Sequence, residues 1–306
     1  MDVVASAEPS PPPAGLLVRE CGPGDRCAIE GLGHPPAIAG ILCPSLARRA
    51  LWRLSGTRVV SIAALDGRTG GAIGCVQFLR SRRARETWMF GHWRVAPALR
   101  RRGIGRLLVR EGTRRLPGVQ RLYSYVEADN ELSREAHARL GFEPALRLRG
   151  VAPLGALSTI GAATPALRLE PVRSRDWDRL FALYAKAMGS LWLRLHPGLG
   201  PGTFLQGTSG GLRAVAAAVA RSGRPPDDAI AGLVVWAGAG TTVFVDPDLC
   251  DQALLARAAL QILARGSRRD DEIRLRGLPQ SIRDRPGPIR LQELWGMPDV
   301  RTQWRG

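Results

Sequence analysis

The pattern of apolar and polar positions over residues 16–150 predicts alternating strands and helices. Period-two stretches bounded by turn residues predict strands, whereas apolar positions three or four residues apart predict helices. The predicted strands are residues 16–20, 58–65, 72–79, 88–95, 121–128 and one that begins at 142. The predicted helices are residues 25–33, 44–54, 104–116 and 130–140. This order indicates an α/β fold on a mixed sheet.

The second half of the chain repeats part of this pattern. A small-residue-rich connector at 151–166 is followed by predicted strands at 167–172, 231–238 and 241–245 and by predicted helices at 176–187 and 253–263. Val245-Asp246-Pro247 echoes Val95-Ala96-Pro97 at an offset of 150 residues. We therefore predict two tandem domains, 16–150 and 167–306, the second a degenerate copy of the first.

The charge composition of the chain adds little to the prediction of its function. The formal net charge is +17, with 44 Lys and Arg against 27 Asp and Glu, and Lys186 is the only lysine. A dedicated nucleic-acid binder more often mixes both cations and clusters them near aromatic residues. Here the arginines are scattered, so nucleic-acid binding is the weakest of the functions considered, and it rests on charge alone.

Nothing in the sequence predicts a metal site or a membrane span. The five cysteines are irregularly spaced and form no C-x-x-C pair, so neither a disulfide framework nor zinc is indicated. Residues 1–15 form a Pro-, Ser- and Ala-rich tail, expected to be disordered, without the basic and apolar regions of a signal peptide. We expect a cytoplasmic protein, monomeric or homodimeric.

The most informative stretch is residues 95–108, VAPALRRRGIGRLL. It lies between a predicted strand and a predicted helix, and a helix start offers unpaired N–H groups and positive potential to an anion. Gly103 and Gly105 remove the Cβ atoms that would keep a diphosphate from those amides, and Arg100 adds a cation. The stretch is neither a P-loop nor a Rossmann fingerprint.

With this stretch after the fourth strand and N-x-x-S-x-x-A-H-x-x-L-G-F at 130–142 after the fifth, the chain resembles the GNAT superfamily of acyl-CoA-dependent N-acetyltransferases. The resemblance covers about residues 16–150 and implies a mixed-sheet GNAT fold with acetyl-CoA as co-substrate. It implies that the loop amides and backbone groups hold this molecule, with the following residues involved: Trp93, Val95, Arg100, Arg101, Arg102, Gly103, Ile104, Gly105 and Asn130. Asn130 is equally interpretable as a plain helix cap.

The catalytic positions depart from the family pattern. His137 stands where many members have a tyrosine that protonates the departing thiolate, and it is the candidate general acid, although it is equally interpretable as an exposed helix-edge histidine. Tyr125 is an alternative donor on the neighbouring strand, where Glu127 shares its face.

The usual base positions hold Gly91 and Met89, which do not titrate. His92 is an alternative base if a bulge re-aims it, and Glu86 and Glu127 are others. A lysine-like amine, with a pKa of about 10.4, is almost entirely protonated at neutral pH, whereas an α-amine near pKa 8 is about one tenth neutral. The missing base therefore favours a less basic acceptor amine.

In the second copy the corresponding loop has lost its phosphate-binding features. Counting from the valine, Cys250 replaces Arg100, Ala253 replaces Gly103 and Leu255 replaces Gly105. The leading function is acetyl transfer from acetyl-CoA to an amine of a small molecule or peptide, by direct attack in a ternary complex. The alternative is a non-catalytic acyl-CoA-binding or interaction protein.

Overall fold

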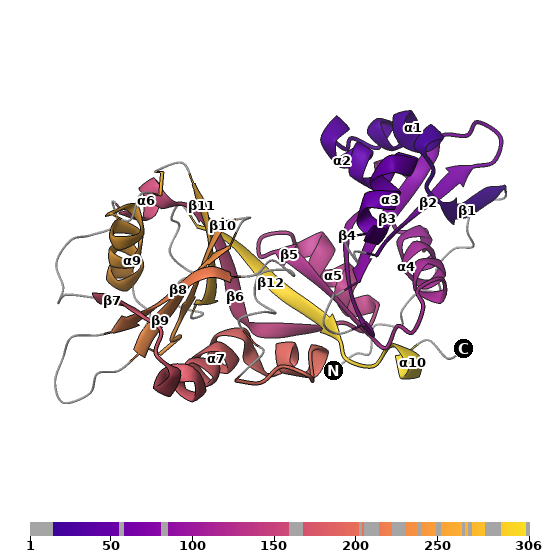
Figure 1. Ribbon diagram of the computed structural model, residues 1–306. Helices are drawn as coiled ribbons and strands as arrows, with labels where there is room; N and C mark the ends of the chain where they lie inside the picture. The colour runs from indigo at the N-terminus through magenta and orange to yellow at the C-terminus, as the bar shows by residue number, and fades with distance from the viewer. Residues whose placement is uncertain are drawn as a thin grey trace. The chain divides into compact units, whose positions relative to one another are not determined.

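The chain forms two compact units in the computed structural model (Figure 1). The first comprises Met1–Ser124 and Asp299–Gly306, the second Tyr125–Pro298. The structure describes residues 15–54, 58–80, 85–158, 168–201, 204, 214–221, 230–237, 240–248, 252–264, 267–268, 271–278 and 289–303. Apart from Gly15, the tail predicted to be disordered lies outside these residues.

The first unit is built on the sheet order β1-β2-β3-β4-β5. Its strands are β1 (Leu16–Glu20), β2 (Val59–Asp66), β3 (Ala72–Arg80), β4 (Thr87–Val95) and β5 (Arg121–Glu127), whose last three residues already count with the second unit. Neighbours among β1–β4 are antiparallel, whereas β4 and β5 are parallel. Its helices are η1 (Pro23–Asp25), α1 (Arg26–Gly31), α2 (Pro36–Leu42), α3 (Leu46–Leu54), η2 (Pro97–Leu99), α4 (Ile104–Arg114) and α10 (Val300–Gln303). The prediction of an α/β fold on a mixed sheet is confirmed.

Helices cover both faces of this sheet. A Cβ on Gly112 of α4 would lie 2.2 Å from the Phe78 ring, and one on Gly74 would lie 2.9 Å from the Leu108 side chain, so α4 packs closely on this face of β3. Cys75, on the opposite face, joins a buried cluster with Ile29 and Leu42 from α1 and α2. Alternation along β3 thus separates the α4 face from the α1–α2 face.

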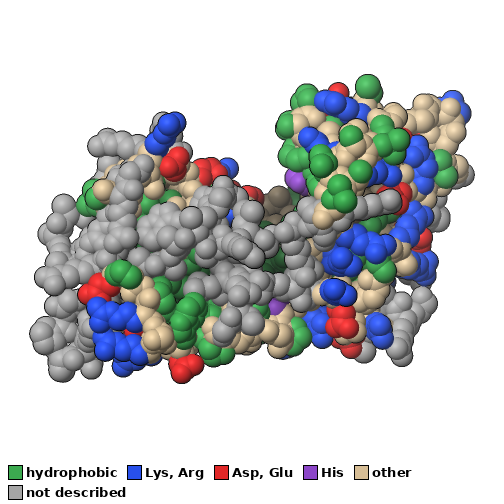
Figure 2. Space-filling model, viewed as in Figure 1, with side chains coloured by type: hydrophobic (Ala, Val, Ile, Leu, Met, Phe, Trp, Pro, Cys, Tyr) green, Lys and Arg blue, Asp and Glu red, His purple; other side chains and the backbone are tan. Residues whose placement is uncertain are grey.

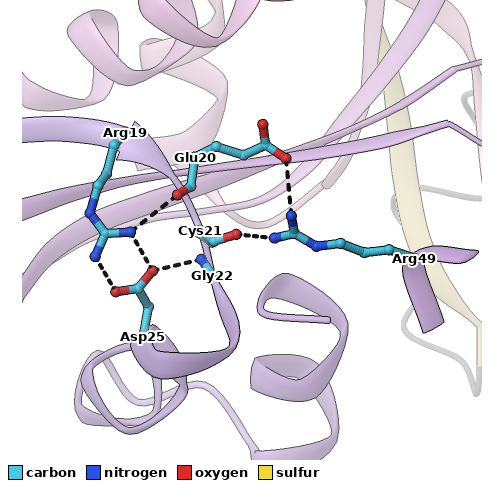
Figure 3. A network of polar contacts seen from close by, with 6 residues as sticks. All are labelled: Arg19, Glu20, Cys21, Gly22, Asp25 and Arg49. Atoms are coloured by element: carbon cyan, nitrogen blue, oxygen red, sulfur yellow. Dashed lines mark hydrogen bonds and ion pairs between the residues drawn. The ribbon is translucent and has the colours of Figure 1, made fainter. Parts of the chain in front are cut away.

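A polar network fixes the chain between β1 and α1 (Figure 3). Arg19 donates to both carboxylate oxygens of Asp25, at 2.8 and 2.6 Å, and the Gly22 N–H donates to Asp25 at 2.7 Å. Burial raises the pKa of Asp25, but these hydrogen bonds outweigh it and the net shift is downward. Arg49 of α3 donates to the carbonyl of Cys21. Asp25 therefore caps the short turn before α1 and does not cap α1 itself.

Two helical features of this unit differ from expectation. Helix α2 was not predicted, since its start at Pro35-Pro36 reads as a loop signal, although proline is well suited to the first turn of a helix. The predicted stripe on α3 is largely exposed, with Leu46 at 77% and Leu54 at 85%. Four-residue spacing predicted the helix correctly but not which side is buried.

The second unit has the strand order β12-β6-β11-β10-β9-β8-β7. Its strands are β6 (Glu143–Pro153), β7 (Arg168–Pro171), β8 (Ala214–Arg221), β9 (Ile230–Ala237), β10 (Gly240–Val245), β11 (Glu272–Leu278) and β12 (Arg290–Met297). Its helices are α5 (Glu131–Arg139), α6 (Leu154–Ser158), η3 (Ser174–Asp176), α7 (Trp177–Leu195) and α9 (Gln252–Ala264). The antiparallel strands β7–β10 are followed by α9 and then by β11, parallel to β10. The same succession forms β1–β4, α4 and β5 in the first unit.

Strand pairing within the second unit explains why the boundary between the two compact units falls after Ser124. Strand β6 pairs on both sides with strands from the end of the chain, β11 and β12, and the Ala128 N–H donates to the Leu291 carbonyl at 2.9 Å. These pairings join residues 125–153 to the later strands. A compact unit of the structure need not coincide with a domain of separate evolutionary origin. The domain bounds 16–150 and 167–306 therefore stay a prediction.

Two details complete the fold. Strand β8 was not predicted, because its sequence AVAAAVAR is dominated by alanine, which is depleted in strands. Part of the predicted connector, 159–166, lies outside the described residues, while its beginning extends β6 and forms α6. Within the described residues, no helix is both long and apolar enough to cross a membrane.

Candidate functional site

The loop between β4 and α4 has the backbone of an anion-binding turn. Arg101 has φ of 63° and Gly103 has φ of 72°, and Gly103 caps α4 in the left-handed conformation. Turns that mix right- and left-handed residues aim successive N–H groups into a concavity that suits anions. Leu107 makes the first helical hydrogen bond back to Gly103, at 2.9 Å. The first N–H groups of α4 precede that bond and carry the positive end of the helix dipole.

Arginines surround this helix start. Arg100, Arg101, Arg102 and Arg106 are exposed, and none of them forms an ion pair with another described residue. Figure 2 shows blue side chains gathered over the part of the first unit that carries α4. Arg100 Nε donates to the Val95 carbonyl at 3.2 Å, which holds the loop closed at its base. The helix start therefore lies in a strongly positive environment.

Gly105 is small for a reason that the sequence did not suggest. A Cβ there would lie 2.7 Å from the Trp93 indole, so Trp93 packs directly against the start of α4. Ile104 beside it is 1% exposed and anchors the helix in the core. A larger residue at 105 would therefore displace Trp93 before it met any ligand.

Strand β4 extends beyond its pairing with β5. The parallel register joins Thr87–Met89 to Arg121–Tyr123 and stops there, although β4 continues to Val95. On its other side β4 stays paired with β3, as far as Val95 opposite Gly74. Trp93 and Val95 lie in the part of β4 beyond the β5 ladder, the part predicted to pair with an extended ligand.

A bulge interrupts β4 at His92. Cys75 pairs with Arg94 and Gln77 with Gly91, so β4 carries one extra residue between these pairs, and His92 has φ of 50°. The His92 ring lies 6.3 Å from the His34 ring, on the α1–α2 face. The bulge thus re-aims His92, the condition on which it was a candidate base.

The loop between α1 and α2 is tied to this bulge. Arg94 Nη1 donates to the carbonyls of Leu32 and Gly33, at 3.1 and 2.6 Å. His34 Nε2 lies 3.2 Å from Cys75 Sγ, and the Cys75 thiol donates to the His92 carbonyl at 3.5 Å. These contacts join the bulge, β3 and the loop, and sequence analysis missed them because the residues are far apart in the chain.

His34, Cys75 and His92 are all held neutral at pH 7. Burial, together with the cationic neighbour Arg94, lowers the pKa of His34 to about 4. Burial raises the pKa of Cys75 to about 12, so its thiol keeps the proton. The pKa of His92 is also lowered, because nearby atoms exclude water from part of its ring even though the residue as a whole is exposed. A neutral His92 imidazole is able to accept a proton.

Tyr125 and Glu127 alternate with buried neighbours along β5 and share one face, as predicted. The Arg276 guanidinium of β11 lies 5.6 Å from the centre of the Tyr125 ring, within cation–π range. Gln292 of β12 donates to Glu127 at 2.7 Å. Two predicted catalytic candidates thus contact residues from the second half of the chain, which no local sequence signal indicates.

Asn130 and His137 have defined structural contacts on α5. Asn130 Oδ1 accepts from the Ser133 N–H at 3.0 Å, which confirms the cap interpretation. His137 is 2% exposed, between Phe142 and Trp295, and burial lowers its pKa to about 4. Its Nδ1 lies 2.6 Å from the Ser133 carbonyl, which only accepts, so we assign the single proton of the neutral ring to Nδ1. The N–H of neutral His137 is therefore engaged by the helix backbone, and the ring is not at an exposed helix edge.

The counterpart of this loop in the second unit lies between β10 and α9. Leu255, at the place of Gly105, is 1% exposed and belongs to the core. Lys186 of α7 bridges Asp246 and Asp248, at 2.5 and 2.7 Å. Cys250 lies outside the described residues. The second loop thus carries two carboxylates and a core leucine, whereas the first carries exposed arginines and Gly105.

In the described part of the chain, no group of three or more His, Cys, Asp or Glu residues is placed to hold a metal ion. Cys21, Cys27, Cys43 and Cys75 are free thiols.

Comparison with known proteins finds similarity to one family over part of the first half. Residues 41–142 match the model of the acetyltransferase (GNAT) family. Similar solved structures include a GCN5-related N-acetyltransferase from Sphaerobacter thermophilus, 16% identical, covering 93% of this chain and 96% of that one with a TM-score of 0.49. Another, from Kribbella flavida, is 15% identical and covers 92% and 71% with a TM-score of 0.35. The ribosomal-protein-S5-alanine acetyltransferase from Vibrio fischeri is 17% identical and covers 44% and 84% with a TM-score of 0.37. No curated protein matches the chain.

Proposed function

We propose that the chain is an acyltransferase that moves the acetyl group of acetyl-CoA to an amine, a proposal supported by the match of residues 41–142 to the acetyltransferase (GNAT) family. The acceptor is a small molecule or a peptide, and its amine attacks the thioester directly in a ternary complex. The observation that carries this proposal is the start of α4, where left-handed Gly103 opens a helix amid arginines without described ion-pair partners. Backbone amides there would hold the diphosphate.

The rest of acetyl-CoA would follow β4. Past Met89 the strand is no longer paired with β5, and an extended pantetheine arm would follow the backbone groups around Trp93 and Val95. The bulge at His92 changes the direction of these groups locally, which suits polarisation of the thioester carbonyl by a backbone N–H. Asn130 would contribute through the cap of α5, whether or not it also contacts the arm.

We propose His92 as the group that accepts the proton of the amine. Its lowered pKa keeps it unprotonated at neutral pH, and the bulge turns it to the α1–α2 face. A base with a low pKa removes a proton readily only from a weakly basic amine, which favours an α-amine over a lysine side chain.

For the proton returned to the thiolate, we propose Tyr125 in preference to His137. A phenol O–H is a hydrogen-bond donor, and the Arg276 guanidinium close to the Tyr125 ring would stabilise the negative charge left behind. His137 would instead fix α5 through Ser133. Glu127, engaged by Gln292, would orient polar groups on the same face.

We propose that the second half is a degenerate GNAT copy without an acetyl-CoA site. The shared succession of strands, helix and parallel strand supports common descent, and the buried Leu255 supports the loss of the site. Its contribution to activity would come through Arg276 and Gln292 on the Tyr125–Glu127 face.

The test is thiol release from acetyl-CoA with a panel of amines, including glycinamide, a short peptide and a lysine side-chain analogue. We expect release that depends on an amine, with the α-amines preferred. If acetyl-CoA binds but no amine accelerates its cleavage, the chain is the non-catalytic acyl-CoA-binding protein of the alternative reading. A strong preference for the lysine analogue would refute the proposal that His92 serves a weakly basic amine.

A further inference from the structure

A cavity of about 290 Å³ opens in the first unit at the carboxyl end of α4, the end opposite the candidate acetyl-CoA loop. Arg110, Thr113 and Arg114 of α4 line one side, and Val300 and Arg301 of α10 line the other. Ten residues of helix separate Gly103 from Thr113, or about 15 Å at 1.5 Å per residue. The cavity is therefore separate from the loop described above.

The floor of the cavity is apolar and preformed. Thr113, Leu116 and Val300 are 5%, 5% and 4% exposed. The Val300 N–H donates to the Gln120 carbonyl at 2.8 Å, which docks α10 onto the turn that follows α4. One wall thus comes from residues that return to the first unit after the whole second unit, as Figure 1 shows for α10.

The rim is cationic. Arg110, Arg114 and Arg301 are all exposed, and Arg114 pairs with Glu111 at 2.8 Å. Neither Arg110 nor Arg301 has an ion-pair partner within the ranges that the structure describes. Arg110 and Arg114 are four residues apart on one helix, a spacing at which like charges destabilise. The arrangement gathers guanidinium groups without supplying enough carboxylates to balance them.

We propose that this cavity binds a small amphipathic anion, in which a carboxylate is attached to an aromatic or branched apolar body. The carboxylate would lie between Arg110 and Arg301, since guanidinium groups match carboxylate oxygens in pairs. The apolar body would cover Leu116 and Val300, which give no hydrogen bonds to a compact inorganic anion. The volume lies at the lower limit of ordinary ligand pockets, which restricts the ligand to a small molecule.

The experiment is calorimetric titration of the full-length protein with benzoate, with benzamide as the neutral isostere and inorganic phosphate as the anion without an apolar body. We expect saturable binding of benzoate. Benzamide and phosphate should each bind more weakly than benzoate, by about tenfold or more. Arg301→Gln and Arg110→Gln should each weaken benzoate binding by about fivefold to tenfold. Arg106→Gln removes the same charge from the same helix outside the cavity and should leave it unchanged. Thermal unfolding of each variant establishes that it is folded.

Three results would overturn the proposal. Undetectable benzoate binding to the folded protein would mean that the cavity holds no such ligand. Equal binding of phosphate and benzoate, or an equal loss in Arg106→Gln, would reduce the cavity to a generally positive surface. Equal binding of benzamide would show that the arginines make no contact with the carboxylate. None of these readouts depends on acetyl transfer, so they remain informative if the proposed function fails.

Discussion

The first loop, residues 95–105, and the second loop, residues 245–255, occupy the same place in two similar successions of elements but differ in chemistry. In the first, Gly103 is left-handed, Gly105 admits the Trp93 ring, and exposed arginines surround the helix start. In the second, Leu255 fills the core, and Asp246 and Asp248 carry negative charge that Lys186 offsets only in part. A shared fold supplies a helix start in both units, and side chains decide whether an anion can use it.

Gly105→Val should cause the largest change in affinity, a loss of acetyl-CoA binding by about 100-fold, or about 2.7 kcal/mol. The added side chain must displace Trp93, whose ring would lie 2.7 Å from its Cβ, and this disrupts the helix start and β4 together. Calorimetric titration with acetyl-CoA measures the effect. Gly31→Val is the matched control, because a Cβ at Gly31 meets only open space and should leave affinity intact. If Gly105→Val bound acetyl-CoA with wild-type affinity, the first loop would not be part of the site.

Leu255→Ala should do the reverse of Gly105→Val. Truncating a leucine that is 1% exposed leaves a cavity and lowers the free energy of unfolding by about 2–5 kcal/mol. Acetyl-CoA affinity of the folded protein should not change, since the second loop binds none. Denaturant unfolding and titration together test this, and a selective loss of affinity without loss of stability would contradict the comparison.

One buried histidine in each unit allows their stabilities to be compared as pH falls. The pKa values of His34 and His137 are about 4 in the folded chain and about 6.5 when unfolded. The unfolded chain thus binds protons first, and stability present above about pH 6.5 is lost towards pH 4, by up to about 3 kcal/mol per histidine. Thermal unfolding between pH 7 and pH 4 measures the loss. His34→Gln and His137→Gln should each remove part of the pH dependence, and an unchanged profile in both would show that neither ring is buried neutral.

Lys186→Met should have the smallest effect. The lysine side chain is 36% exposed and that of Asp248 68%, so water screens the ion pairs and their loss should cost less than about 1 kcal/mol. Acetyl-CoA affinity should again be unchanged, as judged by titration. If the variant gained a second binding event, the second loop would be an occluded site and not a lost one.

The sequence predicted the local features of the fold and of the first loop. Strand and helix order followed from periodicity, and the turn before α4 from Gly103 and Gly105. Residue-level packing was not predictable, because it depends on distant partners. Gly105 was expected to make room for a ligand, but it also makes room for the Trp93 ring. His137 is buried by Trp295 from the other end of the chain.

The catalytic face shows the same limit. Only a bulge in β4 brings His92 near His34, and its position depends on pairing with β3. Arg276 and Gln292 reach Tyr125 and Glu127 from strands about 150 residues further along the chain. A pattern read along one segment contains no information about such contacts.

The stoichiometry of acetyl-CoA binding tests the central claim most directly. Titration of the full-length chain should give one bound molecule per chain, and Gly105→Val should weaken this binding by about 100-fold. Two molecules per chain, or one molecule retained in Gly105→Val, would contradict the assignment of a single site at the first loop.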